Sequence, residues 1–129
     1  MAQVKVYGIK ERLNPIKQYL SDIIHSCVME AFKYPADKKF HRFIALNKEE
    51  FYYPEDRTEN YLIIEISIFE GRSIEAKKEL IRLLFDKISG GLNIATNDIE
   101  ITIFETPKHN WGIRGVPGDE VSLNYTVEV

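Results

Sequence analysis

The sequence feature that most constrains the fold is an internal repeat with an offset of sixty residues. At that offset the two halves align without a gap, so that Val4 falls on Ile64 and Arg12 falls on Arg72. A repeat of this length indicates one structural unit used twice. We therefore predict a single domain, residues 1–129, built from repeats of about 1–60 and 61–129.

The first half has the pattern of a strand, a helix and a second strand. Residues 3–9 form a short strand, and Asn14 followed by Pro15 is typical of a helix start. Apolar residues then recur with helical period to about Phe32. Residues 40–46 are predicted to be the returning strand.

The second half repeats the pattern with clearer signals. Residues 61–69 are rich in β-branched side chains, and Ser73 is a good cap for a helix over 74–89 that Gly90-Gly91 would end. Residues 99–106 form the next strand, glycines and prolines then predict turns, and residues 122–127 are predicted to be a short edge strand.

These two βαβ units predict an α+β fold with one mixed four-stranded sheet and both helices on one face. A crossover through a long helix makes the strands within each unit parallel. We expect the opposite face to carry exposed Ile, Val and Phe side chains, which a homotrimer would bury. The segments near 51–53 and 122–127 would extend the sheets across subunit boundaries.

Composition excludes several classes of function. A formal charge of −3, from 17 basic and 20 acidic residues spread along the chain, offers no cationic field for a nucleic acid. The single cysteine, Cys27, cannot form an internal disulfide, and no apolar run is long enough for a membrane span. A cytoplasmic protein without nucleic-acid or membrane partners is expected, with Cys27 as packing on the apolar stripe of its helix.

Motifs for metals and phosphates do not occur. No His, Cys and carboxylate cluster has metal-ligand spacing, and Gly90-Gly91 closes a helix instead of opening one, so we predict no metal and no cofactor. His25 falls among the solvent-facing positions of the first helix and is predicted to be inert. His109, beside Asn110 and Trp111, is a candidate site residue because histidine titrates near neutral pH.

Two segments of the second half carry a resemblance to a known family. They are Glu70-Gly71-Arg72-Ser73, at a strand-to-helix turn, and the run from Glu105 to Ile113, which contains Trp111-Gly112-Ile113. Together they resemble the tautomerase superfamily, in its form similar to 4-oxalocrotonate tautomerase. The repeat extends the resemblance to the first half, and longer members of the family have this fused layout and are trimers.

The resemblance implies an active site built on the amino terminus. In the family a proline there, freed by removal of methionine, moves protons, and this position falls on Ala2. The family's turn arginine, which binds the substrate carboxylate, falls on Arg12 and on Arg72. Ala2 would offer a primary amine, and a retained Met1 would occlude the pocket.

Further residues are implied around the substrate. Trp111 matches an aromatic pocket wall and Phe51 is its counterpart in the first half, although either ring is equally well interpreted as packing at a subunit boundary. A second family arginine falls on Glu100, so we consider Arg42 and Arg114 as substitutes. With His109 and Asn110 these residues make up the expected substrate-binding set.

Two functions from different classes follow from the resemblance. One is a keto-enol isomerase or related proton-transfer enzyme on a small carboxylate such as a 2-keto acid, with weak or altered activity because Ala2 replaces the proline. The alternative is a catalytically silent trimer that binds a small ligand or a protein. Without the resemblance, Arg12 and Arg72 would be interpreted as solvated surface ion pairs.

Overall fold

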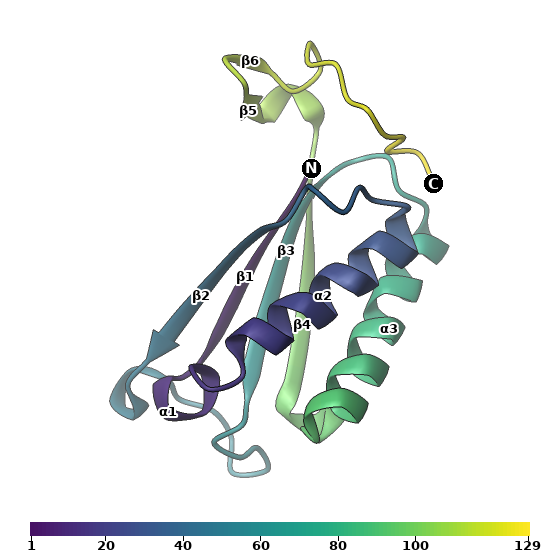
Figure 1. The fold of residues 1–129 in the computed structure, drawn as a ribbon. Coiled ribbons are helices and arrows are strands. Elements are labelled where there is room, and N and C mark those ends of the chain that lie inside the picture. Colours follow the sequence, from purple (N-terminus) through teal and green to yellow (C-terminus); the bar gives the residue numbers. More distant parts are fainter.

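The computed structural model describes residues 1–129 and contains one four-stranded sheet with the strand order β2-β1-β3-β4. Strands β1 and β2 pair in parallel, β3 and β4 pair in parallel, and β1 is antiparallel to β3, as the repeat predicts. Helices α2 and α3 lie side by side across a single face of this sheet (Figure 1). The elements are β1 (Ala2–Ile9), α1 (Lys10–Leu13), α2 (Lys17–Phe32), β2 (Phe40–Leu46), β3 (Leu62–Phe69), α3 (Ile74–Leu92), β4 (Ile99–Thr106), β5 (Gly112–Ile113) and β6 (Val116–Pro117).

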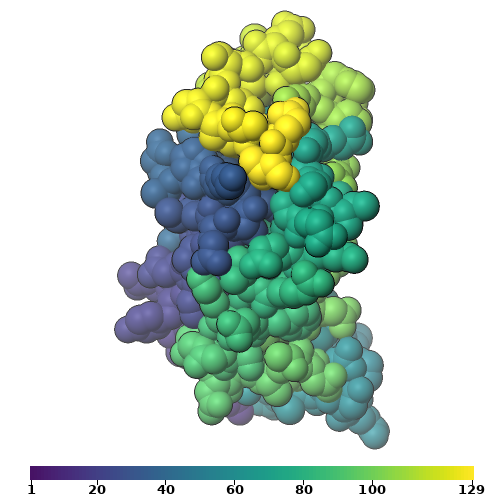
Figure 2. Space-filling view, turned by 90° about the vertical axis from the view of Figure 1, so that its right-hand side faces the viewer, coloured from purple at the N-terminus to yellow at the C-terminus, as the bar shows by residue number.

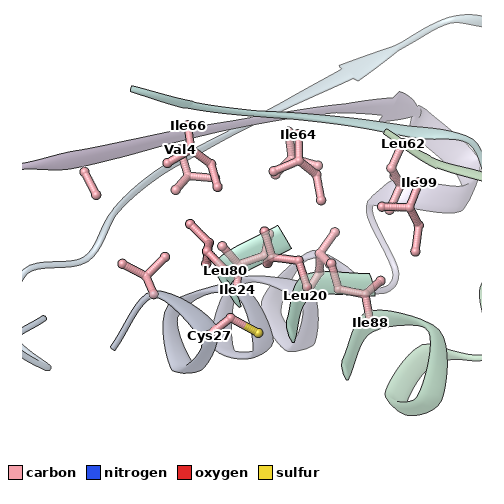
Figure 3. Packing of buried hydrophobic residues seen from close by; sticks show 14 of the residues in the cluster. Val4, Leu20, Ile24, Cys27, Leu62, Ile64, Ile66, Leu80, Ile88 and Ile99 are labelled. Atoms are coloured by element: carbon pink, nitrogen blue, oxygen red, sulfur yellow. The ribbon is translucent and has the colours of Figure 1, made fainter. Parts of the chain in front are cut away.

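The main core lies between the sheet and the two helices. Branched aliphatic residues on the inner faces of β1 and β3 meet those on α2 and α3, and Cys27 is fully buried among them (Figure 3). Burial raises the pKa of the Cys27 thiol to about 11. The thiol is therefore a packing group, as predicted.

The first helix begins later than predicted. A separate turn of helix, α1, comes directly after β1, and Asn14 is its C-terminal cap instead of the N-cap of the long helix. Helix α2 starts at Lys17 without a side-chain cap, and it ends at Phe32 as expected, with Lys33 in the left-handed conformation. The strand turns away from the sheet immediately at Lys10, which leaves Asn14-Pro15 between two helices.

The second helix continues past the two glycines that were expected to end it. It begins after Ser73, whose hydroxyl accepts a hydrogen bond from the Ala76 amide, and it runs to Leu92. Asn93 supplies the left-handed cap. A Cβ at Gly91 would lie 3.2 Å from Ile23 Cδ1 on α2, so this glycine permits a close approach of the helices.

The chain after β4 differs most from its prediction. Residues 122–127 form no strand, and residues 51–53 are also irregular. Instead, β5 and β6 form a small hairpin, and the following chain crosses the end of the sheet (Figure 1). Tyr125 and Val127 pack there against Met1 and Phe69. Their side chains are removed from water in this position, whereas a strand at the sheet edge would leave them exposed.

The sheet face away from the helices is mixed in character, not predominantly apolar as predicted. Lys5 and Glu65 form an ion pair across β1 and β3 at 3.8 Å. The large apolar side chains on this face that are most exposed are Phe40 and Phe104 on the outer strands, at 42% and 46%. The alternation of each strand sends its β-branched residues to the helices and leaves mostly polar residues outside.

The interpretation of His25 as a solvent-facing residue is wrong. Its side chain is buried, with 8% exposure, and its Nε2 lies 2.8 Å from the Ala36 carbonyl oxygen. His41 lies beside it and its Nδ1 lies 2.7 Å from Ser21 Oγ. The loop after α2 folds back over this helix face, which helical periodicity alone does not reveal.

Candidate active site at the amino-terminal end of the sheet

The antiparallel pairing of β1 and β3 sorts the predicted site residues between two ends of the sheet. Ala2 is opposite Ile68, so the chain that follows β3, including Arg72, starts beside the amino terminus. Arg12 follows β1 and therefore lies at the far end (Figure 1). The structure brings Arg72 to Ala2 and does not bring Arg12 there within one chain.

The far end of the sheet is closed by side chains. Arg12 is 55% exposed on its side chain and makes a 3.4 Å ion pair with Glu59. Phe51 is buried there and stacks on Tyr61, with ring centroids 5.5 Å apart. Leu62, the counterpart of Ala2, is 1% exposed and lies inside the chain, so it carries no free amine.

Arg72 is buried without a hydrogen-bond partner. Its residue is 4% exposed, and none of its three guanidinium nitrogens makes a hydrogen bond. The guanidinium carbon lies 4.7 Å from the ring centroid of Phe32, at the end of α2. Burial lowers the pKa of Arg72 from its usual value, and the neighbouring hydroxyls of Tyr125 and Tyr34 act in the opposite direction. Neither hydroxyl is in hydrogen-bonding geometry with the guanidinium. A buried cation with unmet donors is a binding site for an anion.

The amino group of Met1 lies in the same place. Met1 is 5% exposed and its nitrogen donates a hydrogen bond to Tyr125 Oη at 2.5 Å. Burial, followed by the positive charges of Arg72 and Lys108, lowers the pKa of this amine to about 4. The amine is therefore uncharged at neutral pH, which is the state that a proton acceptor requires.

Two tyrosines that the sequence analysis did not select complete the surroundings of the amine. The backbone nitrogen of Ala2 donates to Tyr34 Oη at 3.2 Å, and the Tyr34 and Tyr125 rings meet edge to face at 5.1 Å. Burial raises the pKa of both phenols, which keeps them protonated as hydrogen-bond donors. Tyr34 looked like part of a helix-ending Tyr-Pro pair, and Tyr125 like a strand residue, so neither carried a site signal.

The side chain of Met1 fills an apolar cluster next to the amine. It packs with Phe69 and Val127, and the surrounding residues are Trp111, Ile113, Leu123 and Tyr125. The Trp111 ring meets Phe69 edge to face at 5.0 Å, so it both packs and walls this cluster. The carboxy-terminal segment lies across the adjoining ends of α2 and α3 (Figure 2) and shields the cluster from that side.

The other predicted substrate-binding residues lie nearby but exposed. His109 and Asn110 belong to a short 3-10 turn after β4, and Arg114 donates to the Ser122 carbonyl at 3.3 Å. Arg42 lies on the open face of edge strand β2, beside Lys5 in register. With Gln3 and three neighbours on the strand it lines a shallow basic hollow of about 380 Å³. None of these four side chains contacts the amine.

The structure is thus a fused pair of βαβ units with a buried terminal amine beside a buried arginine. Comparison with known proteins assigns its family. Residues 38–114 match the family model Tautomerase_2, described as "Tautomerase enzyme". The chain therefore belongs to the tautomerase superfamily.

One relative matches most of the chain, and another matches a stretch as long as one repeat. A probable tautomerase of Bacillus subtilis (strain 168) is 27% identical over 99 residues, which is 73% of this chain and 78% of the relative. The 2-hydroxymuconate tautomerase of Pseudomonas putida is 35% identical over 60 residues, covering 46% of this chain and 95% of the relative. The shorter relative thus corresponds in length to one unit of the repeat.

Solved structures share the complete fold. A wild-type fused 4-OT, described as an asymmetric trimer, superposes with a TM-score of 0.81 at 19% identity and covers 91% of this chain and 96% of its own. Malonate semialdehyde decarboxylase superposes with a TM-score of 0.76 at 18% identity, covering 86% and 89%. The four-stranded mixed sheet with two helices is therefore the fold of the fused tautomerases. Neither long helix combines the length and the apolarity that a membrane span needs.

Proposed function

We propose that this protein is a proton-transfer isomerase that interconverts the keto and enol forms of a small carboxylate such as a 2-keto acid. The observation that carries the proposal is the uncharged, buried amine beside the unpartnered guanidinium of Arg72. The amine carries the proton and the guanidinium holds the carboxylate through charge-assisted hydrogen bonds. Within the fold the guanidinium contacts the Phe32 ring but makes no hydrogen bond, so its donors are free for a ligand.

The amine that acts is that of Ala2. Met1 occupies the space between its own amine, Tyr125 and the apolar cluster, so the site opens when Met1 is removed. Ala2 is 3% exposed and directly follows the residue whose amine feels the charges of Arg72 and Lys108. Desolvation and these charges would lower the pKa of an Ala2 amine as they lower that of Met1.

The proposed step balances without a cofactor. In the enol-to-keto direction the neutral amine accepts the proton of the enol hydroxyl, and the oxygen keeps the electron pair as an enolate. The carbon–oxygen double bond then forms while the carbon–carbon double bond breaks, and its electron pair takes the proton from the ammonium. The proton has moved from oxygen to carbon, and the amine is regenerated.

Of the two turn arginines, Arg72 takes the carboxylate role in the proposed site. Trp111 supplies the pocket wall, while Lys108, at the start of the turn that carries His109 and Asn110, adds positive charge near the amine. Arg12 and Phe51 are at the opposite end and have no part in the proposed site. Arg42 lines the separate hollow on the open face and is not assigned a contact with the ligand.

The test uses protein whose loss of Met1 has been verified by intact mass. Arg72→Ala should weaken the binding of a 2-keto acid by roughly 1.5–3 kcal/mol, because alanine offers no charge-assisted hydrogen bonds. Arg12→Ala is the matched control and should leave the affinity unchanged. Equal affinities of wild type and Arg72→Ala would remove Arg72 from the site.

Weak turnover is expected because a primary amine replaces the secondary amine of proline. Ala2→Pro, in protein freed of Met1, should therefore raise the rate of ketonisation of phenylpyruvate enol. A wild-type rate equal to that of Ala2→Pro would place the proton carrier elsewhere.

A silent binding module is the second candidate, and the position of Met1 favours it. The Met1 side chain fills the apolar cluster completely enough to be 5% exposed. A chain that retained Met1 in the cell would have no room for a substrate at this amine. Intact mass of the native protein separates the two candidates.

We also propose that the protein is a homotrimer, as described for the fused 4-OT with which it superposes. The exposed Phe40 and Phe104 on the open face would become buried between subunits. Light scattering should give three times the chain mass of 15.0 kDa at micromolar concentration, and a value near 15.0 kDa would refute the trimer. The reducing cytosol remains the expected compartment for the unpaired thiol of Cys27.

A further inference from the structure

The space filled by Met1 has two chemically different parts. Around its amine are Tyr125 Oη at 2.5 Å and the positive charges of Arg72 and Lys108. Its side chain packs with Phe69 and Val127 in an apolar cluster. Met1 therefore acts as a stand-in for a ligand with one polar end and one apolar tail.

We propose that the site takes a 2-keto acid with a single carboxylate and an apolar tail, and that the Tyr125 hydroxyl binds its keto or enol oxygen. This proposal rests on the proposed function, because it assumes that Met1 is removed and that Arg72 binds the carboxylate. It assigns Tyr125 as a catalytic residue and Tyr34 as a positioning residue.

The role of Tyr125 follows from what the loss of Met1 leaves behind. Its hydroxyl now contacts the Met1 amine and would be left without that partner. The vacated amine position belongs to the residue directly before Ala2, so it lies within the length of one residue from the Ala2 nitrogen. An oxygen bound to Tyr125 would therefore lie within proton-transfer reach of the Ala2 amine.

Arg72 and Tyr125 together fit adjacent oxygens. A 2-keto acid carries its carbonyl oxygen on the carbon next to the carboxylate, and the two groups need neighbouring donors. The unmet nitrogens of Arg72 and the Tyr125 hydroxyl both lie at the amine, and each influences the charge state of the other. As negative charge develops on the enolate oxygen, the phenol O–H donates a stronger hydrogen bond.

Tyr34 holds the amine itself. Its hydroxyl accepts a hydrogen bond from the Ala2 nitrogen at 3.2 Å, and its residue is 4% exposed. This contact does not involve Met1 and would persist after its removal. The Tyr34 hydroxyl would then hold the Ala2 nitrogen in place next to the vacated space.

The tail preference follows from the walls of the cluster. Phe69, Val127, Ile113 and Leu123 offer no donor beside the Met1 side chain, and the one N–H of the half-buried Trp111 cannot pair both oxygens of a second carboxylate. Burial of an unpaired carboxylate there would cost several kcal/mol. A straight alkyl tail as long as a methionine side chain would replace the contacts that Met1 makes.

Three acids of equal carbon number test the proposal by calorimetric titration of Met1-free protein. They are 2-oxohexanoate, hexanoate, which lacks the keto group, and 2-oxoadipate, which ends in a second carboxylate. Wild type should bind 2-oxohexanoate about fivefold more tightly than hexanoate, through the hydrogen bond from Tyr125. It should bind 2-oxoadipate at least about tenfold more weakly than 2-oxohexanoate.

Tyr125→Phe should abolish the preference for the keto acid and keep the affinity for hexanoate. The matched control is Tyr52→Phe, because Tyr52 is 88% exposed and away from the site. An unchanged preference in Tyr125→Phe, or equal binding of 2-oxohexanoate and hexanoate by wild type, would overturn the role of Tyr125. Tighter binding of 2-oxoadipate would overturn the apolar tail.

The same titrations separate this inference from the proposed function. Failure of all three acids to bind wild type, or undiminished binding by Arg72→Ala, would contradict the carboxylate site itself. If Tyr125→Phe does not fold, as judged by circular dichroism, the wild-type preferences among the three acids still decide the proposal.

Discussion

Arg72 illustrates at the residue scale how a functional group can weaken the protein that holds it. A guanidinium that is 4% exposed and has no hydrogen-bond partner has lost its hydration without compensation. An apolar residue of similar volume often matches or exceeds the stability of a buried charged group. The retention of arginine at this position is therefore best explained by a ligand.

Arg72→Met should raise the free energy of unfolding by about 1–3 kcal/mol in the absence of ligand. The same variant should lose keto-acid binding. Denaturant unfolding of wild type, Arg72→Met and the control Arg12→Met measures the effect, and Arg12→Met should change stability by less than about 1 kcal/mol. A clear destabilisation by Arg72→Met would mean that Arg72 has a structural partner within the fold.

His41 makes a separate prediction about acid stability. Burial, with smaller effects from His25 and Lys39, lowers the pKa of His41 to about 4 from 6.5. A histidine whose pKa is lowered by folding binds its proton more readily in the unfolded chain, so stability falls as the pH drops from about 6.5 toward 4. Between pH 6.5 and pH 4, the free energy of unfolding of His41→Gln should therefore fall by roughly 3 kcal/mol less than that of wild type.

Unfolding curves at pH 7 and pH 4 measure this difference, and His109→Gln is the exposed control. If His41→Gln and wild type lose the same stability on acidification, another group dominates the acid response. The terminal amine also lowers the stability on acidification, because folding lowers its pKa to about 4. This effect is present in wild type and in His41→Gln alike.

At the scale of elements, the approach of α2 and α3 predicts different results for two neighbouring glycines. A Cβ at Gly90 would meet nothing within 4 Å, whereas one at Gly91 would lie 3.2 Å from Ile23 Cδ1. Gly90→Ala should raise the free energy of unfolding by about 0.5–1 kcal/mol through helix propensity. Gly91→Ala should raise the free energy of unfolding by less, because the Ile23 side chain must move to make room for the new methyl group.

Chemical denaturation of the two variants gives the comparison directly. An equal rise in the free energy of unfolding for both variants would show that Ile23 moves aside without an energetic cost. A lower free energy of unfolding in Gly90→Ala would contradict a continuous helix through residue 90. The pair is well matched because both positions lie in the last turns of α3.

The elements that the sequence predicted are those whose signals are local and repeated. The four strands, the cap at Ser73 and the helical stripe containing Cys27 follow from alternation, hydrogen-bonding chemistry and helical period. The helix through Gly90-Gly91 was missed because its continuation depends on contact with α2. The carboxy-terminal segment was missed because its burial depends on Met1, which is distant in sequence.

The same distinction holds for the candidate site. Arg72 and Trp111 were selected because they lie in motifs, whereas Tyr34 and Tyr125 reach the amine only through the tertiary fold. Arg12 seemed close to Ala2 because few residues separate them. An eight-residue strand lies between them, and its extended backbone carries Arg12 to the opposite end of the sheet.

In the molecule as a whole, the two ends of the sheet that correspond to the two repeats differ in the residues they carry. One end has a buried amine, a guanidinium without hydrogen bonds and an apolar cluster, and the other has Phe51, Tyr61 and an exposed ion pair. The two halves share a fold, but only one end combines a buried amine with a buried guanidinium. We therefore expect one ligand-binding site per chain in titrations with a 2-keto acid.

The proposed function depends on a terminal amine that is buried beside Arg72 and has a strongly lowered pKa. An NMR titration of the Ala2 amine, labelled with ¹⁵N, measures this pKa in protein shown by intact mass to lack Met1. We predict an amine pKa well below the ordinary range of about 7.7–8.0, rising in Arg72→Met, where a neighbouring positive charge is absent. An amine that titrates within that ordinary range, with no change in Arg72→Met, would contradict this prediction.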